Sequence, residues 1–417
     1  MLTPRGLALC AVAVVAWALG RLLGVDELYV VSAASAAMVL LAVVSTRVSS
    51  TRIAVRRGTG AVHARHRERV PITLQLRNDG RLPASLLLVE DRRPSGITAG
   101  GDEATATRFV VRGLRPRQMA DLRWDAIGTR RGRYTVGPVR IRLRDPFGIA
   151  ERSRRYRGTD DLVVFPRIES LTARGGRGVR QGAERSALRR AFHRGDEFYT
   201  MRAYVVGDDL RHVHWPSTAH RGTLMVRQHE LPWNARAVIH VDTRGHVHRG
   251  SGTRGTFERA VSAAASVLLH IGDLGYDLHL IADDGTTVDG PDGADAALVR
   301  LAEVSPVPQR SPVTTLGRVE RAGNGLLVSI LRPPAGATDL TDDPEVRALL
   351  RAGRGYRART ALVLEHHDRQ RCATLARLLQ LAGWRAAVVA TGEPLVDAWQ
   401  RAIVGAPASE LAGAGHD

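Results

Sequence analysis

The stretch LALCAVAVVAWALG, residues 7–20, contains no charged side chain and decides the N-terminal part of the fold. Two leucines extend it beyond Arg21, and a second apolar run covers residues 28–44, broken only by two serines. Each run reaches about 17 residues, the short end of what crosses roughly 30 Å of hydrocarbon as a helix. We therefore predict a membrane segment, residues 1–47, with two transmembrane helices at about residues 7–23 and 28–44.

Arginine placement predicts how this hairpin is oriented. The loop between the two runs sets Arg21 against two acids, Asp26 and Glu27. The arginines that flank the hairpin are Arg5, Arg47, Arg52, Arg56 and Arg57. By the positive-inside rule, a cell-membrane protein with both termini in the cytoplasm is expected. A cleaved signal peptide is the alternative interpretation of the first run, but it does not explain the second one.

Composition narrows the class of protein. The chain has 417 residues, which predicts two or three domains. It carries 60 basic residues, all of them Arg, and a net charge of +18. A surface with this charge can bind nucleic acid or anionic lipid. The sequence shows no recognisable nucleic-acid-binding fold and no cluster of aromatic residues on which bases could stack. We therefore expect a solvated surface beside the membrane and no nucleic-acid partner. The two cysteines, Cys10 and Cys372, predict neither a disulfide framework nor a cysteine-based zinc site.

Residues 48–166 are predicted to form a β-sandwich domain. Their first part, residues 48–69, is polar and Arg-rich and is either a juxtamembrane linker or a first edge strand. The stretch VPITLQL, residues 70–76, alternates with period 2 and is followed by a turn signal. Further strands are expected at residues 84–89, 107–111, 121–124, 134–136, 139–143 and 162–165. Short strands at this spacing are typical of a sandwich, a fold that favours binding or spacing over chemistry.

The remainder divides into a linker region and an α/β domain. Residues 167–233 begin with a Gly- and Arg-rich stretch that we interpret as a mobile linker, and residues 406–417 are expected to be a flexible tail. Within residues 234–405, strands and helices alternate, which predicts a mostly parallel sheet with helices on both faces. The expected strands cover residues 237–241, 277–282, 325–331, 360–364 and 385–389. The expected helices cover residues 257–271, 294–304, 344–351 and 373–381.

The segment 193–230 is dense in Asp, Arg, Trp and His. On a strand, His212 and His214 would face the same side, and with Asp208 or Asp209 they could bind zinc or manganese. A metal-dependent hydrolase that uses His212, His214 and Asp208 is therefore the alternative function. The competing interpretation is a charged structural segment that clamps the two soluble domains together. Nucleophile or metalloprotease motifs do not occur in the chain. We favour the structural interpretation.

The same segment resembles the signature of the domain of unknown function 58 family. The matching residues are Gly195, Glu197, Phe198, Arg202, Tyr204, Gly207, Asp208, Arg211, Trp215 and Ala219. A second family-like stretch runs RGRYTVGPV from Arg131, then DPFG at residues 145–148 and VFP at residues 164–166. The resemblance implies a membrane-anchored protein with a von Willebrand factor A-like domain, which acts with a MoxR-type AAA+ ATPase to assemble or activate other complexes.

In A-type domains the first strand ends in Asp-x-Ser-x-Ser, whose oxygens bind magnesium. Here Asp242 is kept, but Arg244 and His246 stand where the hydroxyls should be. A cation repels magnesium and cannot ligate it, so we expect no metal and no cofactor, with Arg244 paired to Asp242 in the place of the metal. Asp242 and Thr243 are then candidate partner-binding residues. Together these inferences predict a membrane-anchored assembly factor that binds proteins and is not an enzyme.

Overall fold

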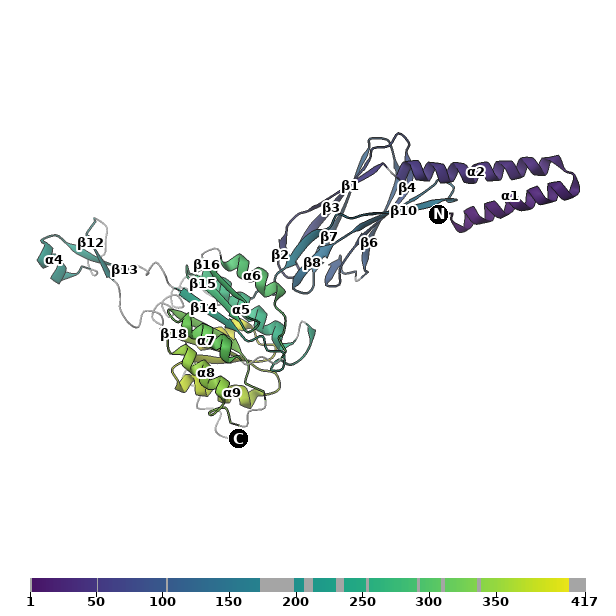
Figure 1. Ribbon diagram of the computed structural model, residues 1–417. Helices are drawn as coiled ribbons and strands as arrows, with labels where there is room; N and C mark the ends of the chain where they lie inside the picture. The colour runs from purple at the N-terminus through teal and green to yellow at the C-terminus, as the bar shows by residue number, and fades with distance from the viewer. Residues whose placement is uncertain are drawn as a thin grey trace. The chain divides into compact units, whose positions relative to one another are not determined.

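The computed structural model describes residues 2–50, 52–102, 104–172, 199–205, 213–229, 236–252, 255–290, 293–308, 312–335 and 339–404. The chain has a mixed α/β architecture with two apolar N-terminal helices and several sheets (Figure 1). It divides into two compact units, Met1–Phe165 and Pro166–Asp417, and each is described by itself.

Unit 1 begins with a hairpin of two helices, α1 (Pro4–Leu23) and α2 (Asp26–Ser50). Both are long and apolar enough to cross a membrane, by length and composition alone. Gly24 ends α1 with φ at +68°, a conformation that glycine adopts without steric cost. Small side chains at Ala13 and Ala16 face the partner helix, and Ser32 Oγ donates to the Ala13 carbonyl over 2.7 Å. The second helix extends six residues beyond the predicted end at residue 44.

The rest of unit 1 is built from strands in three sheets (Figure 1). Two four-stranded sheets have the orders β1-β3-β7-β5 and β10-β9-β4-β6, and a third has the order β2-β11-β8. The strands are β1 (Ile53–Thr59), β2 (His63–Ala64), β3 (Arg69–Asn78), β4 (Ala84–Arg92), β5 (Ile97–Ala99), β6 (Ala106–Leu114), β7 (Met119–Gly128), β8 (Gly132–Val136), β9 (Val139–Arg144), β10 (Glu151–Tyr156) and β11 (Asp160–Val164).

Buried and exposed side chains alternate along β3, and this alternation determines how the sheets pack. Its buried residues point alternately into the domain, and Leu74 and Leu76 join a core with Val89 and Ile141 of the second four-stranded sheet. Each such side chain contributes about 1.5–3 kcal/mol when fully buried. Residues 53–59, which the sequence left as linker or edge strand, are the edge strand β1.

Unit 2 contains a six-stranded sheet with the order β16-β15-β14-β17-β18-β19, in which only β16 is antiparallel. A separate hairpin, β12 (Tyr199–Ala203) and β13 (Met225–His229), flanks the short helix α4 (Trp215–Arg221). The elements of the main sheet and its helices are β14 (Arg236–Val241), α5 (Thr256–Gly272), β15 (Asp277–Ala282), β16 (Thr287–Gly290), α6 (Gly293–Glu303), α7 (Val313–Arg321), β17 (Leu326–Leu331), α8 (Pro344–Gly353), β18 (Ala358–Leu364), α9 (Arg369–Leu381), β19 (Arg385–Val389) and α10 (Leu395–Val404).

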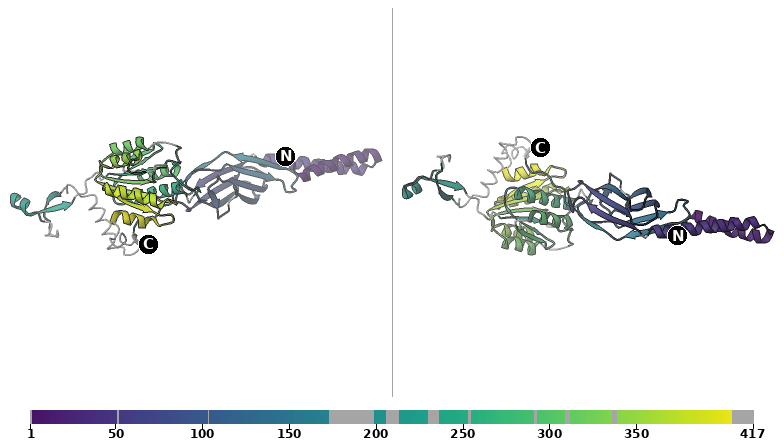
Figure 2. Two further views of the ribbon diagram at one scale, coloured as in Figure 1. Left: turned by 90° about the horizontal axis from the view of Figure 1, so that it is seen from below. Right: turned by 90° about the horizontal axis from the view of Figure 1, so that it is seen from above.

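Helices cover both faces of this sheet (Figure 2). On one face α7, α8 and α9 share a core that includes Leu316, Leu349 and Leu379. On the other face α5 packs beside α6, and the ring of His270 in α5 meets the fully buried Trp399 of α10 edge-on. The mostly parallel sheet with helices on both faces matches the prediction. Its carboxyl edge is where ligands bind in open sheets of this kind.

Residues 166–172 correct the predicted start of the linker. Ser262 Oγ of α5 donates to the Arg167 carbonyl over 2.6 Å, and Glu169 N–H donates to Ser266 Oγ over 2.9 Å. Leu171 is buried. The segment therefore packs on unit 2, because its backbone finds partners along α5. The rest of the predicted linker up to residue 198, and the predicted tail, lie outside the described residues.

Candidate functional site at the carboxyl edge of the sheet

The first strand of the sheet, β14, ends in a buried ion pair. Arg244 Nε donates to Asp242 Oδ1 over 2.8 Å, and Arg244 Nη2 donates to Asp242 Oδ2 over 2.7 Å. The Arg244 backbone N–H also donates to Oδ1 over 3.1 Å. This is the bidentate geometry that a planar guanidinium makes with a carboxylate. The pairing that the sequence suggested for these two residues is confirmed.

A third residue completes this cluster. Arg244 Nη1 donates to Glu345 in the first turn of α8, so the guanidinium bridges two carboxylates. Burial opposes the ionisation of Asp242, but the hydrogen bonds and charge of Arg244 outweigh it and lower the pKa of Asp242 to about 2. Burial also disfavours the charged form of Arg244, yet Asp242 and Glu345 together raise its pKa. Asp242 and Arg244 are therefore held charged at neutral pH.

This geometry does not fit a magnesium ion of the kind that the family resemblance implies. Both carboxylate oxygens of Asp242 accept from Arg244, whose guanidinium lies against them and cannot ligate a metal. Within the described ranges, no group of three or more His, Cys, Asp or Glu side chains is placed to hold a metal ion. The ion pair occupies the place that a ligand would need.

Burial also corrects the predicted partner-binding role of Asp242 and Thr243. Asp242 is 1% exposed and Thr243 is 0% exposed, so neither side chain can touch another protein. The cavity beside them has a volume of about 30 Å³, whereas ligand pockets usually measure about 300–1,000 Å³. The end of β14 is a sealed structural feature of the domain.

A buried histidine fixes the loop that follows. His248 Nε2 lies 2.8 Å from the Asp242 carbonyl oxygen and must carry the proton, because a carbonyl only accepts. Its Nδ1 lies 3.1 Å from Thr256 Oγ1 at the start of α5. Burial is the largest influence and lowers the pKa of His248, which keeps the ring neutral. The neutral ring thus ties the end of β14 to the start of the next helix.

A serine, a histidine and an aspartate line up in the middle of the sheet. His240 Nδ1 lies 2.8 Å from Ser329 Oγ, and His240 Nε2 lies 3.5 Å from Asp283 Oδ1. The order resembles a hydrolytic triad, but Ser329 is 0% exposed within β17 and no substrate can reach it. Asp283 Oδ2 instead accepts the Thr243 N–H over 3.1 Å. The chain of contacts connects three strands and is structural.

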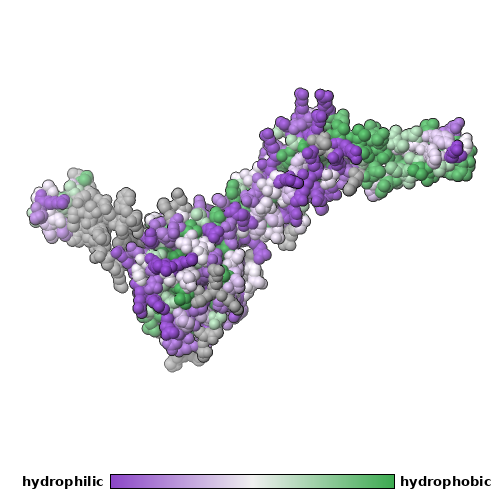
Figure 3. Space-filling model, viewed as in Figure 1, coloured by the Kyte–Doolittle hydropathy of each residue, from purple (hydrophilic) through white to green (hydrophobic). Residues whose placement is uncertain are grey.

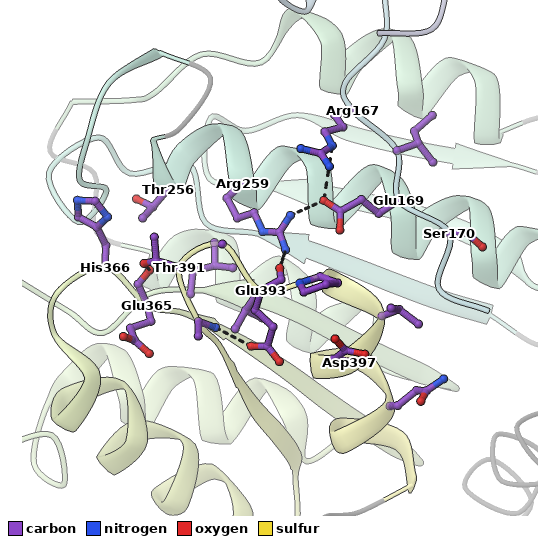
Figure 4. Close-up of a pocket in the computed structure, with 18 of the residues that line it drawn as sticks. Arg167, Glu169, Ser170, Thr256, Arg259, Glu365, His366, Thr391, Glu393 and Asp397 are labelled. Carbon is purple, nitrogen blue, oxygen red and sulfur yellow. Dashed lines mark hydrogen bonds and ion pairs between the residues drawn. The ribbon is translucent and has the colours of Figure 1, made fainter. Parts of the chain in front are cut away.

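The open site of unit 2 lies farther along the same edge, at the ends of β18 and β19. It is a groove with a volume of about 1,030 Å³. Its walls are residues 167–172, the start of α5, and the loops that follow β18 and β19 (Figure 4). The polar residues on these walls include Thr256, Glu365, His366, Thr391, Asp397 and Gln400.

Arg259 holds the groove together from its position on α5. Its guanidinium pairs with Glu169 and donates to the Glu393 carbonyl, as the dashed lines of Figure 4 show. The other Glu169 oxygen accepts the Leu395 N–H over 2.9 Å and so caps the start of α10. Burial disfavours ionisation of Glu393, but hydrogen bonds from Arg401 and Ala390 outweigh it and lower its pKa. The side chains that frame the groove are therefore paired with one another.

The rim of the groove is exposed and carries both signs of charge. Asp397 and Thr391 are exposed, and Arg167 has 70% of its side chain exposed. The N-termini of α5 and α10 also open into it, and each adds a partial positive charge. A polar rim around a fixed frame suits the recognition of a polypeptide segment more than the enclosure of a small apolar ligand.

The structure describes only part of the signature segment. Tyr204, Trp215 and Ala219 are described, and Arg202 lies on β12. Gly195, Glu197, Phe198, Gly207, Asp208, Arg211 and also His212 lie outside the described residues.

Within the described part of this segment, His214 caps α4. Its Nδ1 accepts the Ser217 N–H over 3.3 Å and lies 2.8 Å from Ser217 Oγ. Trp215, the first residue of α4, is 67% exposed. The metal-dependent hydrolase built on His212, His214 and Asp208 receives no support from these contacts.

Two features of the edge escaped sequence reasoning. One is Glu345, whose partner Arg244 lies 101 positions earlier in the chain. The other is the groove, whose frame joins Glu169 to a helix start 226 positions later. Local spacing carries no signal for either contact. The sequence can predict that a helix starts at Asp343, which caps α8. It cannot predict that the first turn of this helix lies beside Arg244.

Comparison with known sequences gives a partial family match. The profile of the family "Protein of unknown function DUF58" matches residues 200–322, which include most of β12, the Asp242–Arg244 pair and the elements from β14 through α7. The chain is also similar to the uncharacterized protein YeaD of Bacillus subtilis (strain 168), with 22% identity over 201 residues. The alignment covers 48% of this chain and 48% of that relative, so the chain spans about half the length of YeaD.

Comparison with solved structures adds little. The CARDB domain of PF1109 from Pyrococcus furiosus has 14% identity and a TM-score of 0.20, over 27% of this chain and 91% of that one. The sporulation control protein Spo0M from Bacillus subtilis has 15% identity and a TM-score of 0.17, over 37% of this chain and 58% of that one. Neither score carries an argument. What the comparisons support is similarity to DUF58 proteins through residues 200–322, a family whose function is unknown.

Proposed function

We propose that this chain is a membrane-anchored assembly factor that binds other proteins and catalyses no reaction. The observation that carries the proposal is the open groove of about 1,030 Å³ at the carboxyl edge of the sheet. Its frame is internally paired and its rim presents exposed charges of both signs. The neighbouring end of β14, where an A-type domain would engage its ligand, is sealed by Arg244 instead. Recognition is therefore assigned to the groove.

The anchor in this proposal is the helix hairpin of unit 1. Both helices have the length and apolar character that a bilayer requires, and large apolar side chains such as Leu22, Val30 and Leu40 are exposed along them (Figure 3). The flanking arginines favour an orientation with both termini in the cytoplasm. In this arrangement unit 2 works on the cytoplasmic side.

The finer assignments belong to the same proposal. We interpret the strands of unit 1 as a β-sandwich spacer and the main sheet of unit 2 as a von Willebrand factor A-like head. The partner that the family resemblance implies is a MoxR-type AAA+ ATPase, and the groove is its proposed contact. The bilayer is the other partner, and no nucleic acid takes part.

The test is recovery of partners from gently solubilised membranes with a tagged full-length chain. A charge reversal at the groove, Asp397→Arg, is compared with Asp295→Arg. Both residues are exposed acids in the first turn of a helix, α10 and α6, so both variants lose the same helix-dipole stabilisation. Only Asp397 lines the groove.

The wild-type chain and the Asp295→Arg variant should recover a MoxR-type ATPase. The Asp397→Arg variant should recover roughly tenfold less, which corresponds to about 1.4 kcal/mol of binding free energy. Recovery of no ATPase by the wild type would overturn the partner assignment. Equal recovery by both variants would overturn the groove as its binding site.

A further inference from the structure

The turn that joins β9 to β10, residues 145–150, is packed against the start of the helix hairpin. Thr3 N–H donates to the Ile149 carbonyl over 2.9 Å, and Thr3 Oγ1 donates to the Gly148 carbonyl over 2.5 Å, with the Ile149 oxygen 3.0 Å away. Gly6 approaches so closely that an added Cβ would collide with the Ile149 carbonyl. Only residues 51 and 52 lie between the end of α2 and β1. The strands of unit 1 are therefore held directly at the base of the helices.

The contacts of this turn fix its depth along the helices. Ile149 and Ala150 form a small apolar core with Ala42, and Val39 and Val43 pack against it. These α2 residues belong to the last part of the apolar run, which ends at residue 44. Val39 lies five residues before that end, or about 7 Å along the helix. A helix segment that spans the hydrocarbon would thus bring the turn to the border between acyl chains and headgroups.

The tip of the turn is apolar and exposed. Phe147 has 60% of its surface exposed, although the adjacent Ile149 and Ala150 are buried. The exposed arginines Arg5 and Arg152 lie at the start of α1 and just after the turn. An exposed aromatic side chain between arginines is the pattern of a membrane-interface contact, because the ring enters the lipid and the guanidinium groups reach the phosphates.

Several backbone N–H groups of the turn find their acceptors within it. The Asp145 carboxylate accepts the N–H groups of Phe147 over 2.9 Å and of Ala150 over 2.6 Å. Gly148 N–H donates to the Asp145 carbonyl over 3.1 Å. Because an unpaired backbone group costs several kcal/mol in hydrocarbon, a turn with its own acceptors is suited to a low-dielectric surface.

We propose that residues 145–150 form a second membrane contact, in which Phe147 enters the interfacial zone of the bilayer on the side of the strands. This inference rests on the proposed membrane anchor and adds a site to it. The consequence is that the strands of unit 1 stand against the lipid in a fixed orientation. They do not hang from the hairpin on a free tether.

The test places an environment-sensitive fluorophore on a single cysteine, Phe147→Cys, in the full-length chain with Cys10→Ala. The buried Cys372 stays in place. The protein is reconstituted in vesicles of phosphatidylcholine and phosphatidylglycerol, with lipids brominated near the headgroup end of the acyl chains as quenchers. Two controls carry the same label. Leu40→Cys lies on the exposed face of α2, and Val110→Cys is exposed on β6, at the other edge of the sheet that contains β10.

The label at position 147 should lose most of its fluorescence to the brominated lipid, as should the label at position 40, while the label at position 110 is quenched only by aqueous iodide. Quenching at position 40 but not at 147 would overturn the second contact and leave the anchor standing. Loss of lipid quenching at both positions would overturn the anchor as well. A label at 147 that neither quencher reaches would place the turn against protein and also contradict the proposal.

Discussion

Two places on the carboxyl edge of one parallel sheet use their charges in opposite ways. At the end of β14, Asp242 and Glu345 both pair with Arg244 and leave a cavity of about 30 Å³. At the ends of β18 and β19, Arg259 and Glu169 also pair, but they frame a groove of about 1,030 Å³. Ion pairs close the first place and hold the second place open.

The difference lies in where each cation comes from. Arg244 is two residues from Asp242 and folds back onto it, so the pair forms within one loop and fills its own site. Arg259 stands on a helix and reaches two segments that are distant in sequence, residues 166–172 and the loop after β19. At the end of β14 the two-residue Asp242–Arg244 pair fills its own site and Glu345 adds one distant contact, whereas at the groove every contact of Arg259 joins distant segments. We therefore expect partner binding at the groove and not at the end of β14.

The largest effect is expected from breaking the sealed cluster. Arg244→Leu leaves the buried Asp242 carboxylate without a counter-charge, which should cost about 3–5 kcal/mol of folding free energy. Hydrogen exchange of the amides in β14, measured in the full-length chain, reports this loss. Arg249→Leu is the matched control, because Arg249 is exposed in the same loop and should cost no more than about 0.5 kcal/mol.

A double variant separates charge from packing. If the uncompensated charge causes the loss, Asp242→Asn combined with Arg244→Leu should cost clearly less than the sum of the two single variants. Strict additivity would show that Arg244 acts through its packing alone. Equal exchange rates in the Arg244→Leu and Arg249→Leu variants would remove the distinction between a sealed and an open site.

The sequence predicted the ion pair at the end of β14 but not the groove at the ends of β18 and β19. Strands such as β14 and β17 are mostly apolar short runs, so their positions and the parallel sheet could be predicted from composition and length. The Asp242–Arg244 pair was also readable, because both residues lie in one short segment. The groove was not, since its frame depends on contacts such as Glu169 to Leu395 that only the folded chain creates.

The missed elements have a related cause. β10 reads ERSRRY and lies at the edge of its sheet, where its side chains need no apolar alternation. α7 has only nine residues and is polar on average, so its buried face of Thr315, Leu316 and Val319 is easily overlooked beside the longer apolar runs. Edge strands and lightly buried helices are fixed by their neighbours in space, and pattern analysis of a single sequence cannot supply those neighbours.

Acid should weaken the sealed cluster by a smaller amount. The folded pKa of Asp242 is lowered to about 2, from an ordinary value of 3.8. A lowered carboxyl pKa gives stability that is fully present above about pH 4 and is lost as the pH falls to about 2, a difference of about 2 kcal/mol. Hydrogen exchange in β14, corrected for the intrinsic pH dependence, should show this loss. The Asp242→Asn variant should lack it, and an unchanged acid response in that variant would assign the effect to other groups.

The smallest effect concerns the frame of the groove. Glu169→Gln puts an NH₂ group where two donors, Arg259 and the Leu395 N–H, now meet carboxylate oxygens, so one donor must lose its partner. We expect a cost of about 1 kcal/mol, seen as faster exchange at the start of α10. Glu365→Gln is the control, because Glu365 also lines the groove and changes only the charge of its rim, with a cost within about 0.5 kcal/mol. If the two variants showed the same exchange rates, apolar contacts and not the Glu169 ion pair would hold the groove. Ion pairs would then determine the structure only at the end of β14.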